Sequence, residues 1–118
     1  MSINSIIFYE NLPKLDLHGL DSIYARMKID EFVKDSIKLR NKYVVIVHGI
    51  GEGILLKTTH EYLKNNSNVL DYKLAFNNGG VTLVELSIWQ QYKLLISYYL
   101  QNAKDLLSIW QKWFLVLV

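Results

Sequence analysis

The sequence contains no cysteine and only one proline, Pro13. Without cysteine the chain cannot form disulfides, thiolate zinc sites or a cysteine nucleophile, which fits a reducing compartment. We therefore expect a cytoplasmic protein. The N-terminus has no basic region and only a short apolar run, so no signal peptide is expected. A chain of 118 residues is long enough to bury the core of one domain.

The chain also lacks a strong excess of either charge. Up to residue 86, ten Lys and Arg residues are balanced by ten Asp and Glu residues, so the net charge of +2 comes from the tail. A balanced body does not favour strong non-specific binding to nucleic acid, and such binding would depend on a local patch. Charged residues also interrupt the apolar tail. No uncharged run therefore approaches the roughly 20 residues of a membrane span, and no transmembrane segment is expected.

One stretch, residues 43–55, combines an apolar run, a histidine, three glycines and the start of a helical pattern. The apolar run predicts a buried strand, and the glycines, Gly49, Gly51 and Gly53, permit a tight turn. The free N–H groups at the start of the following helix suit an anion, most often a phosphate. Lys57 would lie in that first turn, either near the phosphate or simply solvated. His48 adds a group that exchanges protons near neutral pH. The alternative is a turn that needs glycine for its geometry alone.

A second short strand pattern, residues 15–18, alternates leucines with Asp16 and His18. Alternation places these two ionisable side chains on one face at the end of a strand, where they could act together. The alternative is a surface Asp–His pair without a chemical role.

The intervening pattern predicts a helix from about residue 22 to 40, so strand, helix and strand form a right-handed crossover with parallel strands. Both His18 and His48 then lie at the carboxyl edge of the sheet, where open α/β folds bind ligands. A second helix is expected at about 54–65, with His60 exposed beside Glu61. Strands at 69–76 and 81–86 are predicted to pair through a hairpin loop at 77–80.

These motifs resemble the Smr (small MutS-related) domain over residues 14–86. The resemblance rests on Leu-Asp-Leu-His-Gly at 15–19, His-Gly-Ile-Gly-Glu-Gly at 48–53 and Gly-Gly-Val-Thr-Leu-Val-Glu-Leu at 79–86. It implies an α/β two-layer sandwich in which a mixed four-stranded sheet packs against two helices in the order βαβαββ. An extended arm at 1–13 and a helical tail at 87–118 would flank this domain.

The resemblance also implies nucleic-acid endonuclease activity, with RNA favoured over DNA and stalled ribosomes as a further partner. Carried over by motif, the residues associated with cleavage are Asp16, His18 and His48. We expect one histidine to act as general base and the other as general acid, so no cofactor is required, although a route using a divalent metal stays open. The residues expected to hold the phosphate backbone are Gly49, Gly51, Gly53, Lys57, Gly79 and Gly80.

Several positions depart from the family pattern and weaken these expectations. Ile50 replaces a commonly basic residue, Glu52 an uncharged one, and Leu56 stands where an arginine is frequent. These changes support the alternative function, a nucleic-acid or ribosome-binding module without catalysis. The tail does not resemble the family. Its aromatic and aliphatic residues recur at helical spacing, so it could pack on the sheet, form a homodimer, lie on a membrane surface or be foreign to the natural domain.

Overall fold

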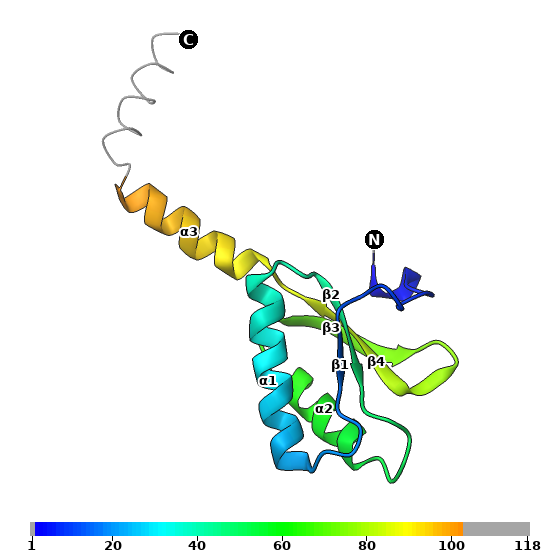
Figure 1. Ribbon diagram of the computed structural model, residues 1–118. Helices are drawn as coiled ribbons and strands as arrows, with labels where there is room; N and C mark the ends of the chain where they lie inside the picture. The colour runs from blue at the N-terminus through cyan, green and yellow to red at the C-terminus, as the bar shows by residue number, and fades with distance from the viewer. Residues whose placement is uncertain (1, 103–118) are drawn as a thin grey trace, which may run out of the picture. The chain divides into compact units, whose positions relative to one another are not determined.

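The structure is a computed structural model that describes residues 2–102. The chain divides into two units, the first ending at Ile88 and the second beginning at Trp89. In the first unit, four strands form one sheet in the order β1-β2-β4-β3 (Figure 1). Their bounds are Lys14–Asp16 for β1, Tyr43–Val47 for β2, Asn78–Leu86 for β4 and Val69–Ala75 for β3. The β1–β2 pair is parallel and the other two pairs are antiparallel. The predicted mixed four-stranded sheet is confirmed.

Two helices, α1 (Ser22–Lys38) and α2 (Ile54–Lys64), cover one face of this sheet (Figure 1). Asp21 is the N-cap of α1, since its Oδ1 accepts the Tyr24 backbone N–H at 2.8 Å. The apolar side chains of α1 repeat every three or four residues, and Ala25, Ile29, Val33 and Ile37 are buried as their spacing predicts. The crossover from β1 through α1 to β2 places the carboxyl ends of both parallel strands at the same edge of the sheet.

The opposite face of the sheet is covered by the N-terminal segment. This segment contains one 3₁₀ turn at Ile3–Ser5 and a second turn at residues 10–11, where the Leu12 N–H donates to the Tyr9 carbonyl at 3.2 Å. Ile3 and Ile6, which are 1% and 5% exposed, join the strand residues Val45, Val81 and Leu83 in a second core cluster. The first 13 residues therefore contribute to the packed core.

The hairpin between β3 and β4 is tighter than the sequence predicted. Ala75 pairs with Asn78, so Phe76 and Asn77 alone form the turn, and Asn77 adopts a left-handed φ of 58°. Asparagine tolerates this conformation because its side chain is short and polar. The predicted four-residue loop at 77–80 was wrong, and Gly79 and Gly80 belong to β4.

The second unit contains α3, Trp89–Asn102. The tail was expected to be helical, and the rest of that prediction, residues 103–118, lies outside the described residues. Within residues 2–102, no helix has the length and apolar character needed to cross a membrane. Packing of the tail on the sheet, homodimerisation and binding to a membrane surface all stay predictions.

Candidate nucleic-acid site

A cleft of about 460 Å³ lies where β2 leads into α2. It is lined by residues 48–56 of the loop and of the first turn of α2, and by residues 20–22 at the start of α1. Gly53, the N-cap of α2, has a φ of 81°, a left-handed conformation that glycine adopts without a steric penalty. The first bond within the helix runs from the Lys57 N–H to the Gly53 carbonyl at 3.0 Å. The N–H groups of residues 54–56 come earlier in the chain than this bond. They have no acceptor within the helix and are available to a ligand.

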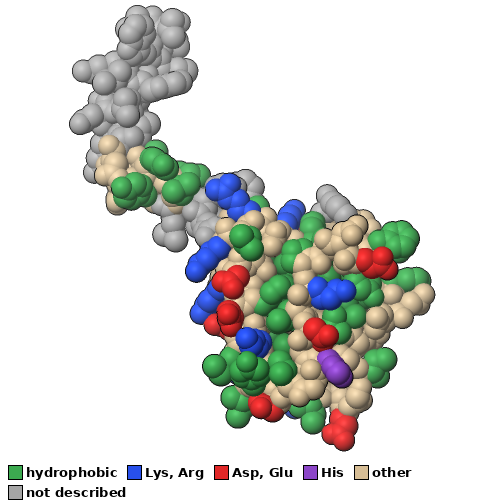
Figure 2. Space-filling model, viewed as in Figure 1, with side chains coloured by type: hydrophobic (Ala, Val, Ile, Leu, Met, Phe, Trp, Pro, Cys, Tyr) green, Lys and Arg blue, Asp and Glu red, His purple; other side chains and the backbone are tan. Residues whose placement is uncertain are grey.

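The charges around the cleft are mainly negative. Its lining includes the carboxylates of Asp21 and Glu52, and among the described residues no Lys or Arg lines it. Lys57 is exposed in the first turn of α2 but is not part of the lining. On the face of the molecule shown in Figure 2, Lys and Arg side chains alternate with Asp and Glu side chains and form no basic stripe. An anion in this cleft would therefore be held by backbone N–H groups and not by basic side chains.

Asp16 and His18 lie beside this loop but outside the cleft. Asp16 is in register with Val47, and the Leu17 N–H donates to the Val47 carbonyl at 2.8 Å, so the two chain segments leave the sheet side by side. Both side chains are exposed, and the Asp16 Oδ1 accepts the His18 backbone N–H at 2.9 Å. Of the three residues expected to act in cleavage, only His48 lines the cleft.

His48 is 4% exposed and both of its ring nitrogens have partners. Nδ1 donates to the Gly49 carbonyl oxygen at 2.9 Å, and Nε2 lies 2.8 Å from Oγ1 of Thr82 on β4. The ring is therefore fixed from two sides, by its own loop and by the neighbouring strand.

His60 shares the same hydroxyl. Its Nε2 lies 2.9 Å from Thr82 Oγ1, its ring is perpendicular to that of His48 at 6.0 Å between centroids, and its other ring contact is Tyr72 at 5.1 Å. The expectation that His60 is exposed was wrong, since it is half-buried. Burial, and secondarily the charge of His48, lower the pKa of His60 below its ordinary value. The sequence held a signal for this position, because His60 precedes the buried Leu63 by three residues on the same helical face.

The backbone of Gly80 on β4 contacts the glycine loop. Its carbonyl oxygen accepts the N–H groups of both His48 and Gly49, each at 3.0 Å. A Cβ at Gly80 would lie 3.2 Å from the Gly49 backbone, whereas a Cβ at Gly79 would meet nothing within 4 Å. Neither glycine lines the cleft. Gly80 allows the loop to approach β4 closely, which positions the cleft.

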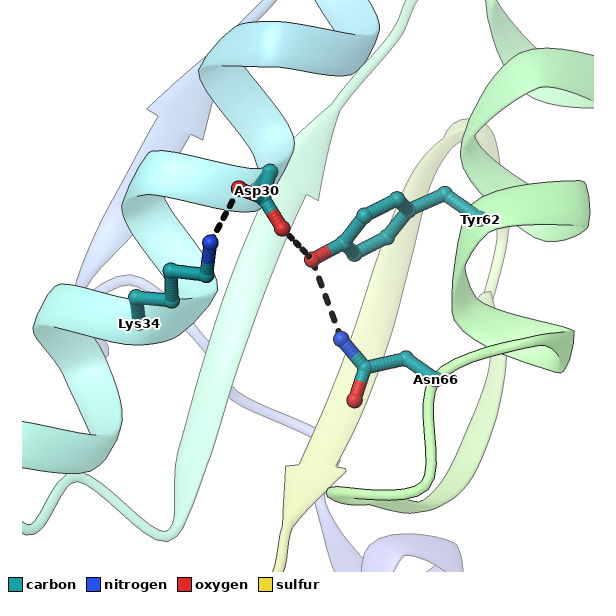
Figure 3. A network of polar contacts seen from close by, with 4 residues as sticks. All are labelled: Asp30, Lys34, Tyr62 and Asn66. Carbon is teal, nitrogen blue, oxygen red and sulfur yellow. Dashed lines mark hydrogen bonds and ion pairs between the residues drawn. The ribbon is translucent and has the colours of Figure 1, made fainter.

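A polar network ties α1 to α2 beyond the cleft (Figure 3). The Tyr62 hydroxyl donates to Asp30 Oδ1 at 2.7 Å and accepts from the Asn66 amide at 3.0 Å, while Lys34 pairs with the other Asp30 oxygen at 2.8 Å. The bonds from Lys34 and Tyr62 lower the pKa of Asp30, and burial followed by the Asp30 bond raises the pKa of Tyr62. The tyrosine therefore stays protonated and keeps donating across the helix pair.

For the metal route, the described residues contain no group of three or more His, Asp or Glu side chains arranged to hold an ion. The divalent-metal alternative stays a prediction.

Comparison with known proteins places residues 15–87 in the Smr domain family. Endonuclease MutS2 of Clostridium beijerinckii is 41% identical over 76 residues, and that of Brevibacillus brevis 39% over 75, covering 62% and 61% of this chain. The chain spans only 10% of the length of these curated relatives.

Two solved structures share the fold. The Smr domain of Thermus thermophilus MutS2 superposes with a TM-score of 0.63 and 27% identity, covering 64% of this chain and 98% of that one. YdaL of Escherichia coli, a stand-alone small MutS-related protein, gives a TM-score of 0.60 at 20% identity, covers 63% of each chain, and supports the fold alone. The sheet order, the glycine loop and the matched motifs agree with one another, and this chain belongs to the Smr domain family.

Proposed function

We propose that this chain is a nucleic-acid phosphodiesterase that cleaves RNA in preference to DNA. Membership of the Smr family supports nuclease activity or nucleic-acid binding in general. The observation that carries the specific proposal is the exposed Asp16–His18 pair, which leaves the sheet beside a glycine loop with available N–H groups. A phosphodiester held at the loop would lie near two groups able to exchange protons.

RNA provides its own nucleophile for this reaction. The 2′-oxygen attacks the adjacent phosphorus and forms a 2′,3′-cyclic phosphate, while the bond from phosphorus to the 5′-oxygen breaks. One group must take the proton of the 2′-hydroxyl and another must protonate the departing 5′-oxygen. DNA lacks the 2′-hydroxyl and would need a water nucleophile, which is why RNA is the preferred substrate in this proposal.

Accessibility decides which side chains carry these protons. His18 and Asp16 are exposed, so neither side chain has to leave a buried position to meet a strand bound beside the loop. His48 is buried, and it would have to release either Gly49 or Thr82 before it could exchange a proton with a substrate. We therefore assign direct proton exchange to His18 and Asp16, and to His48 the holding of the glycine loop.

The test is cleavage of labelled single-stranded RNA, the matching DNA and their duplexes, with and without a chelator. We expect RNA cleavage in chelator, and its loss by about 10²- to 10⁴-fold in His18→Ala. Asp16→Asn should lower the rate as well. Asp71→Asn is the matched control, because Asp71 is also exposed and also accepts a neighbouring backbone N–H, from Tyr72 at 2.8 Å. Full cleavage by His18→Ala, or loss of cleavage in chelator, would refute the proposed mechanism.

A second candidate is a binding module without catalysis. The burial of His48 favours it, because both ring nitrogens already have partners and are not free to exchange protons with a substrate. Gel-shift experiments on the same substrates separate the two functions. Retarded bands without cleavage of any substrate would establish the binding module and remove the assignment of His18.

A further inference from the structure

Thr82 is the point where three elements of the fold meet through one hydroxyl group. It lies on β4, is fully buried, and is paired in register with Ile46 of β2 and Leu74 of β3. Its Oγ1 lies within hydrogen-bond distance of Nε2 of His48, from the glycine loop, and of Nε2 of His60, from α2. The two bonds, of 2.8 and 2.9 Å, join loop, strand and helix.

The directions of these hydrogen bonds follow from one fixed acceptor when the His48 ring is neutral. The Gly49 carbonyl oxygen can only accept, so Nδ1 of His48 carries a hydrogen. In a neutral imidazole Nε2 is then bare and must accept, so the Thr82 hydroxyl donates to it. The hydroxyl has one hydrogen, and its remaining role toward His60 is to accept. Nε2 of His60 therefore carries a hydrogen and donates.

His60 is well placed to keep this role. Its ring is half-buried between the His48 ring and Tyr72, and all buried side-chain nitrogen and oxygen atoms among the described residues have a partner. Its lowered pKa, caused first by burial, favours the neutral ring that this arrangement requires. Because Nε2 of His60 donates to Oγ1 of Thr82, the hydrogen of the Thr82 hydroxyl is directed toward Nε2 of His48.

We propose that His60 is a positioning residue of the nucleic-acid site. It acts through the Thr82 hydroxyl to reinforce the Nδ1–H tautomer of His48 that the Gly49 carbonyl selects, and with it the position of the glycine loop. The role in cleavage or binding rests on the proposed function, whereas the direction of the hydrogen bonds does not. His60 touches neither substrate nor reacting atoms in this scheme.

Long-range ¹H–¹⁵N correlation spectra of the whole chain test the proposal, because they distinguish a protonated ring nitrogen from a bare one. We expect wild-type His48 to carry hydrogen on Nδ1 and His60 to carry it on Nε2. A wild-type His48 protonated on Nε2 would overturn the inference without any variant.

Variants test the contribution of His60. His60→Phe keeps a ring beside Tyr72 but removes the donor, so we expect both His48 tautomers and an increase of about tenfold in amide hydrogen exchange at Gly49, Gly51 and Gly53. His60→Gln should restore both properties because its amide donates at a similar reach. Spectra of His60→Phe identical to the wild type would refute the role of His60.

A second pair of variants covers the case in which His60→Phe does not fold. Thr82→Val preserves the volume and removes the hydroxyl, while Thr82→Ser keeps it. We expect mixed tautomers in the first and the wild-type tautomer in the second, and the same tautomer in both would overturn the inference.

Activity separates the two proposals. A fall of about tenfold in RNA cleavage or binding in His60→Phe, rescued by His60→Gln, supports the positioning role. Unchanged activity with mixed tautomers would refute that role. A wild-type protein with the expected tautomers but neither cleavage nor binding would refute the proposed function instead.

Discussion

Replacing Gly80 by alanine would press a methyl group against the glycine loop. The new Cβ would lie 3.2 Å from both the Cα and the carbonyl carbon of Gly49, and 3.3 Å from Oδ1 of Asn78. Carbon atoms in favourable contact are about 3.5–4.0 Å apart, so the loop must move by a few tenths of an ångström. Gly49 cannot move freely, because its N–H and that of His48 both donate to the Gly80 carbonyl. We expect the free energy of unfolding to fall by about 1–3 kcal/mol, the usual cost of overpacking.

Gly79→Ala is the matched control for this substitution. The two glycines are neighbours in β4, neither has a left-handed φ, and a Cβ at Gly79 meets nothing within 4 Å. Both substitutions restrict the unfolded chain equally, so this contribution cancels in their difference. Urea denaturation of the two variants measures that difference directly. A midpoint for Gly80→Ala equal to that of Gly79→Ala would refute the close packing of loop and strand.

Two further predictions concern other side chains of the same unit. Because the folded-state pKa of His60 lies below its ordinary value of 6.5, the unfolded chain binds more protons once the pH falls below about 6.5, and stability declines from there through the folded-state pKa. Urea midpoints measured between about pH 7.5 and 5 should decline less in His60→Gln than in the wild type, and equal slopes would contradict this prediction. Tyr62→Phe removes the hydroxyl that joins Asp30 and Asn66 and should lower the free energy of unfolding by about 1 kcal/mol. Tyr24→Phe, at an exposed position, serves as its control in the same denaturation assay, and an equal effect of both changes would show that the network adds nothing to stability.

The elements with a strong hydrophobic period were predictable from the sequence. The stripe from Ala25 to Ile37 defined α1, and the apolar run before His48 defined β2, because local spacing alone identifies a buried face. The parallel pairing of β1 and β2 followed from the crossover rule. These features depend on patterns within one stretch of chain.

The errors arose where contacts between residues far apart in the sequence determine the local structure. The glycines at 79 and 80 have the composition of a turn, but Gly80 is needed inside β4 because the Gly49 backbone comes so close. His60 has a charged neighbour and was expected to be solvated, yet it is half-buried and forms a hydrogen bond with the hydroxyl of Thr82, 22 positions away. Alternation along β4 places Thr82 on the same face as Val84, but the two histidines that it joins could not be paired from spacing alone.

The buried N-terminal residues have a consequence for choosing where the domain begins. The family match starts at residue 15, so a protein cut to that boundary would lose Ile3, Ile6 and the Pro13 carbonyl that accepts the Val45 N–H at 2.9 Å. Full burial of an isoleucine side chain contributes about 1.5–3 kcal/mol, so losing both would remove a large part of the roughly 5–15 kcal/mol that stabilises a typical domain. In the trimmed protein, the apolar sheet face formed by Val45, Val81 and Leu83 would also be exposed to water. We therefore expect the smallest unit of this chain that folds independently to include the residues before the family match.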